Sequence, residues 1–89
     1  MLNTSFLLMA KYNALPVIPL SEVAKDFFSH LTPKKFREKL NSGDIKLAVV
    51  RMERSKQTAL GIHLNDLAEY IDKRREAAVK ELEQISSAT

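Results

Sequence analysis

The sequence predicts a small, mostly helical α+β fold, and three observations lead to this class. Two short segments with helical spacing lie close together, at residues 21–29 and 33–42. A stretch rich in Val, Ile and Leu follows them and is divided by a polar turn. From Asn65 onward a helical apolar pattern continues with no breaker before Ser86. Because a chain of 89 residues can bury little more than one core, we expect one domain over residues 1–89.

Residues 1–20 are expected to supply a core segment and a short strand. Residues 3–13 form either a helix that opens at Asn3 or Thr4, or a strand, because the apolar run is too brief for its periodicity to decide. In the sequence LPVIPL, the two prolines force Leu15 and Ile18 toward extended backbone, which predicts a short strand.

The first of the two paired helices is predicted over residues 21–29. Ser21 offers an N-cap, and Glu22 places an acid in the first turn, where the helix dipole favours it. Phe27 and Phe28 share the helical apolar spacing with Val23, so both aromatic residues are expected in the core.

The second helix carries stronger local signals. Thr32 is a suitable N-cap, Pro33 suits the first helical position, and Leu31 can pack on Phe36 across the cap. Gly43 is expected to end the helix. Two short helices separated by about three residues outline a helix-turn-helix.

Residues 45–64 are predicted to form a β-hairpin with the polar tip ERSKQT. Residues 21–64 would then contain a helix-turn-helix followed by a hairpin, which is the order of elements in a winged helix-turn-helix. In such a domain the hairpin, or wing, reaches phosphates or the minor groove beside the helix that reads the major groove.

A long helix is predicted over residues 65–85, with SSAT as a loose tail. Its apolar stripe continues through Ala78, Leu82 and Ile85, beyond the length that a small domain can cover. We therefore expect a homodimer, or an intramolecular partner such as residues 3–13. Arg75 interrupts the heptad pattern, which argues against a long coiled coil.

Positive charge is concentrated in the middle of the chain. Residues 33–57 contain eight of the 14 Lys and Arg residues but only three of the 11 acids, whereas the whole chain has a net charge of +3. A basic face of this kind suits DNA, although a lysine-rich surface helix or a polar turn alone is equally often only solvated. The predicted DNA-contacting residues of the second helix and the wing are Lys34, Lys35, Arg37, Lys39, Asn41, Arg51, Arg54 and Lys56.

Other kinds of site have no anchor in the sequence. The chain has no cysteine, so no disulfide is expected, and His30 and His63 are expected to be satisfied polar residues rather than metal ligands. No catalytic motif or nucleotide-binding glycine loop is present, so we expect neither an enzyme nor a bound cofactor. Tyr12 and Tyr70 are assigned to the core rather than to base stacking.

The longest apolar run, residues 6–10, is far too short to span a membrane. A cytoplasmic protein without membrane contact is therefore expected.

Five blocks of the sequence resemble the pyocin activator protein (PrtN) family of phage-related transcriptional activators. They are NTSFLLMAKYN, VIPL, FFSHLTPKKF, GDIKLAVVR and GIHLNDLAEYIDKRR. The resemblance implies activation of bacteriocin or prophage genes through short promoter elements. Ala48 occupies a place where the family is expected to have proline. A wider similarity to excisionase and AlpA-like domains of the MerR type implies the winged helix-turn-helix fold.

We therefore expect a sequence-specific activator that binds double-stranded promoter DNA, with RNA polymerase as a further partner. An excisionase-like protein that bends DNA for recombination is an alternative. A second alternative, from a different class, is a protein–protein adaptor that acts through its C-terminal helix, with the basic segment serving only as a solvated face.

Overall fold

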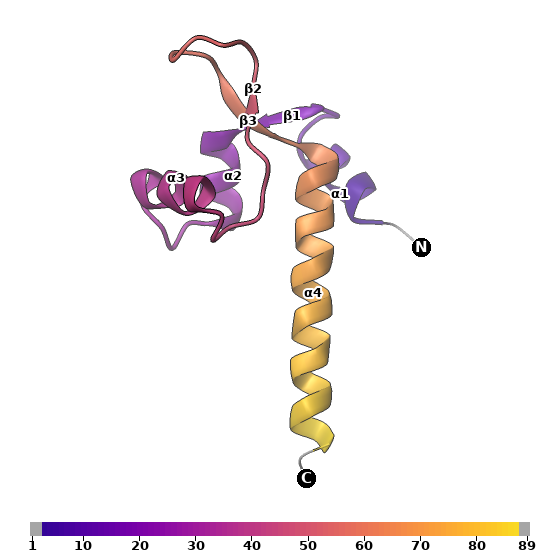
Figure 1. Cartoon of the computed structure of the whole chain (residues 1–89). Helices are drawn as coiled ribbons and strands as arrows, with labels where there is room; N and C mark the ends of the chain where they lie inside the picture. The colour runs from indigo at the N-terminus through magenta and orange to yellow at the C-terminus, as the bar shows by residue number, and fades with distance from the viewer. Residues whose placement is uncertain (1–2, 88–89) are drawn as a thin grey trace.

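The computed structural model describes residues 3–87 and has the predicted α+β architecture. Within these residues the chain forms four helices and three strands (Figure 1). Their order is α1 (Thr4–Lys11), β1 (Val17–Pro19), α2 (Leu20–Phe27), α3 (Pro33–Ser42), β2 (Val50–Arg51), β3 (Leu60–His63) and α4 (Leu64–Ser87). The N-terminal elements and the sheet gather around the first turns of α4, whereas the rest of α4 projects away from them (Figure 1).

Residues 3–13, for which the sequence left helix and strand open, contain helix α1. Asn3 caps it, because its side-chain oxygen accepts a hydrogen bond from the backbone N–H of Phe6 at 2.8 Å. Leu8 and Tyr12 turn into the core. On the α4 side, the Thr4 hydroxyl donates to Asp72 at 2.5 Å. Helix α1 therefore packs on the first half of α4. It does not cover the apolar stripe further along α4, so the expectation that residues 3–13 would be the intramolecular partner of that stripe was wrong.

The three strands form one antiparallel sheet in the order β1-β3-β2. Ile18 of β1 pairs with Ile62 of β3, and both side chains are fully buried. The expected strand around the two prolines of LPVIPL is therefore present. The predicted hairpin is also present, but its first strand is shorter than expected.

Regular pairing in the first hairpin strand covers only Val50 and Arg51 instead of starting at residue 45. The Ile45 N–H donates to the carbonyl of Lys39, and the Leu47 N–H donates to the carbonyl of Ile45. These amides are therefore already satisfied, and the two side chains are buried in the core instead.

Helix α2 differs from its prediction at both ends. It begins at Leu20, with Pro19 as the N-cap and no capping side chain, so the assignment of Ser21 as the cap was wrong. It ends at Phe27, and Phe28 leaves the helical path to stack on Phe36, with ring centroids 4.7 Å apart. This change of direction after Phe27 buries Phe28 and leaves Phe27 37% exposed. The expectation that Phe27 lies in the core was therefore also wrong.

The core lies between the sheet, the helix pair α2–α3 and the first turns of α4. Its fully buried large side chains come from all of these elements and are Ile18, Val23, Phe36, Ile62 and Leu67. The pair α2–α3 is a helix-turn-helix-like unit, although its connection, residues 28–32, is longer than the predicted three residues.

Helix α4 begins one residue earlier than predicted and continues through Ser87. Instead of starting a loose tail, Ser87 is helical, and its hydroxyl donates to the carbonyl of Glu83 at 2.8 Å. Residues 88–89 of the predicted tail lie outside the described residues. The uncovered apolar stripe is confirmed, because Leu82 is 63% exposed and Ile85 is 68% exposed. Across residues 3–87, no helix combines the length and the hydropathy that crossing a membrane requires.

Candidate nucleic-acid interface

Helix α3 has the local structure that its sequence predicts. The Thr32 hydroxyl accepts from the backbone N–H of Lys35 at 3.1 Å, and Pro33 opens the helix. Gly43 ends it with φ of 83°, a left-handed conformation that glycine adopts without the steric cost of a side chain. Phe36 and Leu40 fix the inner face of the helix in the core.

The outer face of α3 is exposed and mostly cationic. Lys34, Lys35, Arg37 and Asn41 are all exposed, and Lys39 is half-buried at the flank. Neither this helix nor its cap places an acid in the first turn, where two lysines instead face the positive end of the helix dipole.

One ion pair within α3 partly neutralises this positive charge. Lys35 lies 3.7 Å from the carboxylate of Glu38, and more than half of each side chain is exposed. Exposed pairs of this kind contribute about 0–1 kcal/mol. The Lys35 ammonium can therefore exchange this partner for a phosphate at little loss.

Hydrogen bonds order the tip of the β2–β3 hairpin. The Met52 N–H donates to the carbonyl of Ala59 at 3.3 Å, and the Glu53 N–H donates to the hydroxyl of Thr58 at 2.9 Å. The N–H of Thr58 in turn donates to the carbonyl of Ser55 at 3.2 Å. The tip is thus a defined turn that presents exposed Arg54 and Lys56.

The register of the sheet places Arg51. Arg51 pairs with Leu60 of β3, and residues directly opposite on paired strands share a face of the sheet. Leu60 lies on the same face as Ile62, two residues along, whose side chain is fully buried beneath the helices. Arg51 therefore lies on the face of the sheet that the helices cover, but at its exposed edge. Arg54 and Lys56 lie beyond the paired strands, in the tip.

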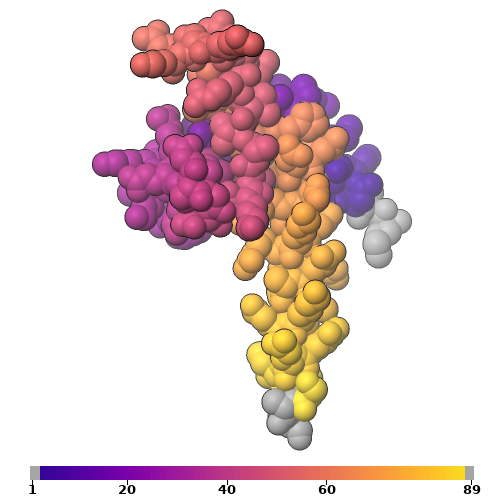
Figure 2. Space-filling view, in the orientation of Figure 1, coloured from indigo at the N-terminus to yellow at the C-terminus, as the bar shows by residue number. Residues whose placement is uncertain are grey.

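The eight predicted residues fall into two groups, one on α3 and one on the hairpin. Both elements lie on the same side of α4, with the hairpin tip above α3 in this view (Figure 1). The space-filling view shows the tip projecting from the body, with an open recess between it and α3 (Figure 2). The structure thus places the two groups on separate projections that a single extended ligand could bridge.

A neighbouring groove also contains cations, but it does not extend the basic surface of α3 and the hairpin tip. A groove of about 430 Å³ separates the segment before β2 from α4. Its charged lining residues are Lys46, Lys73 and Arg74 together with Asp44, Asp66 and Glu69. Because the acids and bases balance, this groove is less suited to a polyanion than α3 and the hairpin tip.

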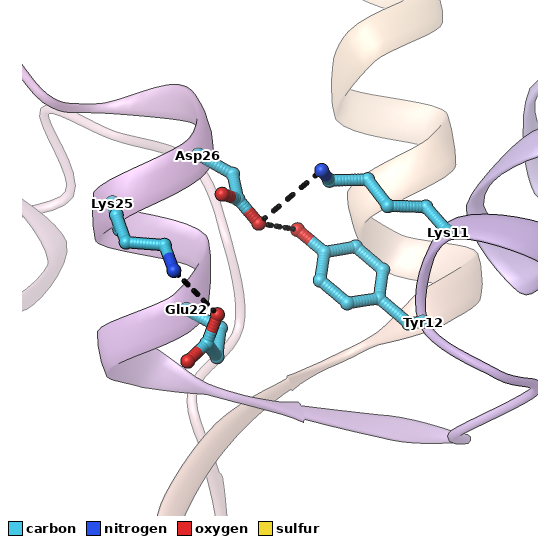
Figure 3. A network of polar contacts seen from close by, with 5 residues as sticks. All are labelled: Lys11, Tyr12, Glu22, Lys25 and Asp26. Carbon is cyan, nitrogen blue, oxygen red and sulfur yellow. Dashed lines mark hydrogen bonds and ion pairs between the residues drawn. The ribbon is translucent and has the colours of Figure 1, made fainter.

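A polar cluster that the sequence analysis did not identify ties α1 to the helix pair (Figure 3). The Tyr12 hydroxyl donates to a carboxylate oxygen of Asp26 at 2.6 Å, and the Lys11 ammonium lies 3.7 Å from the same oxygen. The hydrogen bond from Tyr12 and the nearby cations lower the pKa of Asp26. Burial, together with this carboxylate, raises the pKa of Tyr12 well above its usual range. The cluster therefore orients α2, and with it α3, relative to α1 and α4.

The histidines have ordinary surroundings. The Nδ1 atom of His63 accepts from the backbone N–H of Asn65 at 3.0 Å and so caps the first turn of α4, as expected of a satisfied polar residue. His30 is exposed, with its ring centroid 6.2 Å from that of Phe28. In the part of the chain that the structure describes, no group of three or more His, Cys, Asp or Glu residues is arranged to hold a metal ion.

Comparison with known proteins identifies the family. The sequence model of the family described as pyocin activator protein PrtN matches residues 4–78, which include α1 to β3 and the first half of α4. The chain belongs to this family. Comparisons with curated proteins and with solved structures gave no match.

Proposed function

We propose that this member of the pyocin activator family binds double-stranded promoter DNA and activates transcription of bacteriocin or prophage genes. The observation that carries the proposal is the exposed cationic face of α3, formed by Lys34, Lys35 and Arg37 on a helix whose opposite face is anchored in the core. A surface helix that carries lysines at the unfavourable end of its dipole is suited to bind an anion from outside the chain.

In this proposal α3 enters the major groove and the β2–β3 hairpin acts as a wing. The recognition residues are Lys34, Lys35, Arg37, Lys39 and Asn41. The wing residues Arg51, Arg54 and Lys56 contact phosphates beside the groove. Arg and Lys contacts to phosphate supply affinity and orientation, whereas contacts from α3 to base edges supply specificity.

Residues 1–89 act in this proposal as one DNA-binding domain in the cytoplasm. Residues 21–64 form its winged helix-turn-helix, and the exposed part of residues 65–85, beyond the turns of α4 that pack in the core, is available for contact with another protein chain. RNA polymerase is the partner through which a promoter-bound activator would raise transcription, and a homodimer would form through the exposed apolar stripe of α4.

A mobility-shift assay at two salt concentrations tests the proposal. The chain should shift a cognate promoter fragment in preference to a scrambled fragment, and the affinity should fall steeply as salt rises, because phosphate contacts release counterions. No preferential shift at either salt concentration would contradict the proposal and favour the adaptor alternative.

The double substitution Arg54→Ala/Lys56→Ala tests the wing. It should weaken binding to the cognate and scrambled fragments about equally and reduce the slope of log affinity against log salt by up to about 2 units. Lys80→Ala is the matched control, since Lys80 is an exposed cation of distal α4. A slope that the double substitution leaves unchanged would remove the hairpin from the interface.

A further inference from the structure

Most of the exposed large apolar side chains of residues 3–87 lie on two helices. Six of the nine belong to α1 or to α4 beyond residue 78. The α1 patch consists of Phe6, Leu7 and Met9, and the α4 patch consists of Val79, Leu82 and Ile85, with exposures from 39% to 68%. Exposed apolar side chains gathered on neighbouring elements are typical of an interaction surface.

Two hydrogen bonds fix the direction of the N-terminal segment along α4. The Thr4 hydroxyl, at the start of α1, donates to Asp72. The carbonyl of Pro16, beyond the end of α1, accepts from the N–H of Leu64 at the start of α4, at 2.9 Å. The segment therefore runs antiparallel to α4, and the start of α1 points toward the distal half of α4.

The α4 patch lies on the face of α4 that α1 contacts, but beyond the start of α1. At 100° per residue, Val79 lies about 20° from Asp72, the residue that Thr4 contacts, and Leu82 lies about 20° from Ile71, which packs against the core. In Figure 1 the distal half of α4 extends beyond every other element, so within residues 3–87 no part of the fold covers this patch. The distal face of α4 is therefore open to a helix placed in line with α1.

The α1 patch faces away from the core of its own chain. Leu8 is buried, and Phe6 lies about 160° from it around the helix, on the opposite side. In Figure 1 α1 and the pair α2–α3 lie on opposite sides of α4. A partner that approaches from the side of α1 therefore leaves α3 and the hairpin free.

The size of the two patches indicates that both take part in one interface. If a large apolar side chain presents about 150–200 Å² when fully exposed, the six side chains together offer on the order of 500 Å² per copy. A two-fold interface that joins the α1 patch to the α4 patch twice would bury roughly 1,000 Å², which is the size expected of a specific interface. Pairing of the two α4 patches alone would bury about half of that area.

The charges beside the α4 patch favour α1 over a second α4 as its neighbour. Residues 76–87 of α4 contain Glu76, Glu81 and Glu83 against Lys80, whereas α1 contains Lys11 and no acid. Two distal α4 segments would bring like charges together. An α1 of a second copy, in line with the first α1 and with its start toward it, instead brings its Lys11 end toward the acidic end of α4.

We propose that the chain forms a two-fold dimer in which the α4 patch of each copy packs on the α1 patch of the other. The arrangement rests on the homodimer included in the proposed function, and it adds α1 of the second copy as the surface that covers distal α4. Each α1 lies between its own α4 and the distal α4 of the second copy, and the starts of the two α1 helices point toward the two-fold axis. Both copies of α3 and of the hairpin stay exposed, so the dimer presents two DNA-binding surfaces for two half-sites.

Sedimentation of the full chain tests the association. The wild type should sediment as a dimer at micromolar to high micromolar concentration. Phe6→Glu and Leu82→Glu should each sediment as a monomer with an unchanged melting temperature, because both side chains are more than half exposed and lie outside the core. Gln84→Glu adds the same charge on the opposite side of α4 and should remain dimeric. A monomeric wild type, or a dimer that survives either Phe6→Glu or Leu82→Glu, would overturn the proposal.

Cysteine pairing tests which helices meet, because the chain has no cysteine of its own. Cysteine is itself a small apolar residue, so it can replace a patch residue without adding charge. A mixture of Phe6→Cys and Leu82→Cys chains should form a disulfide-linked heterodimer under mild oxidation. Leu82→Cys alone should not cross-link, since the two copies of Leu82 lie at opposite ends of the interface. Efficient cross-linking of Leu82→Cys alone would show that α4 pairs with α4 and would refute the arrangement.

The outcomes distinguish this arrangement from the proposed function. If the chain is monomeric but shifts its promoter in a salt-dependent way, the dimer is refuted and DNA binding is not. If Phe6→Glu remains dimeric while Leu82→Glu does not, the homodimer through α4 stands and only the contact with α1 is refuted. If the chain dimerises as described but shows no preference for the promoter, only the proposed DNA binding is refuted.

Discussion

The most direct test of the proposed interface is to substitute the inner and the outer face of α3 in separate variants and to compare their effects on stability and on promoter binding. The inner change is Phe36→Ala. Phe36 is 1% exposed and its ring stacks on Phe28, so the substitution should destabilise the fold by about 3–5 kcal/mol through lost burial and a residual cavity. For a domain of this size each kcal/mol corresponds to roughly 4–8 °C in melting temperature, so a fall of about 12 °C or more is expected.

The outer change replaces Lys34, Lys35 and Arg37 by alanine. All three are exposed, so no core contact is lost. The Lys35–Glu38 pair is exposed and contributes about 0–1 kcal/mol. Against this loss, removing two cations from the positive end of the helix dipole gains about 0.3–1 kcal/mol for each. The melting temperature should therefore stay unchanged or rise slightly, while preferential promoter binding is abolished.

Thermal melting and promoter binding, measured on both variants, decide between the interpretations. Phe27→Ala is a matched control, because it removes the same ring from the neighbouring helix at a position that is 37% exposed and should lower the melting temperature much less. If the folded triple variant still binds the promoter at wild-type affinity, α3 is only a solvated surface helix.

Three further predictions concern the scaffold. In Tyr12→Phe, the pKa of Asp26 should rise toward the usual value of about 3.9 in a carboxyl NMR titration, because the hydrogen bond that lowers it is lost. The stability that this bond supplies is fully present above the usual pKa of Asp26, and it is lost as the pH falls through the lower pKa that Asp26 has in the folded state. The difference in melting temperature between wild type and Tyr12→Phe should therefore shrink in acid. A difference that is constant with pH would contradict the coupling. Gly43→Ala should destabilise the chain by about 1 kcal/mol in denaturant unfolding, because its φ of 83° is left-handed although nothing lies within 4 Å of the added Cβ. Gly61→Ala should cost more, since its Cβ would lie 2.6 Å from the Val17 side chain, and equal losses at the two glycines would refute this reasoning.

The parts of the fold that the sequence predicts well are those set by neighbouring residues. Helix α3 is the clearest case, because Thr32, Pro33 and Gly43 act within one turn of the ends that they define. The paired strands around Ile18 and Ile62 follow from proline and from apolar alternation in the same way. Such signals are read without knowledge of the rest of the chain.

The errors arise where a distant contact overrides the local pattern. Phe27 and Phe28 are equivalent in helical spacing, and only the stacking of Phe28 on Phe36 from the next helix decides which ring is buried. Residues 45–49 alternate like a strand, but the carbonyl of Lys39 takes the N–H of Ile45. Likewise, nothing in the sequence pairs Tyr12 with Asp26, which lie 14 residues apart.

For the candidate interface, the sequence predicts which cations are exposed but not how they are grouped. The helical period places Lys34 and Arg37 off the apolar face, and the structure agrees. The sequence cannot show that the hairpin lies on the same side of α4 as α3, because this arrangement depends on how β3 leads into α4. This tertiary arrangement also separates the basic surface from the mixed groove around Lys46, which no count of charges along the chain could do.

The position of the lysines within α3 distinguishes a binding face from a merely soluble one. Solubility would be served equally well by acids at Lys34 and Lys35, and acids there would also stabilise the helix by about 0.3–1 kcal/mol each. The stability of the helix would therefore be higher with acids than with lysines at these two exposed positions. The cap and the core contacts of the same helix, in contrast, are those that stabilise it. A phosphate near the helix start reverses this balance, because it interacts favourably with both ammonium groups and with the positive end of the dipole. The unfavourable charge of the free helix thus becomes favourable only when an anion is bound, which is the behaviour that the proposed DNA contact requires.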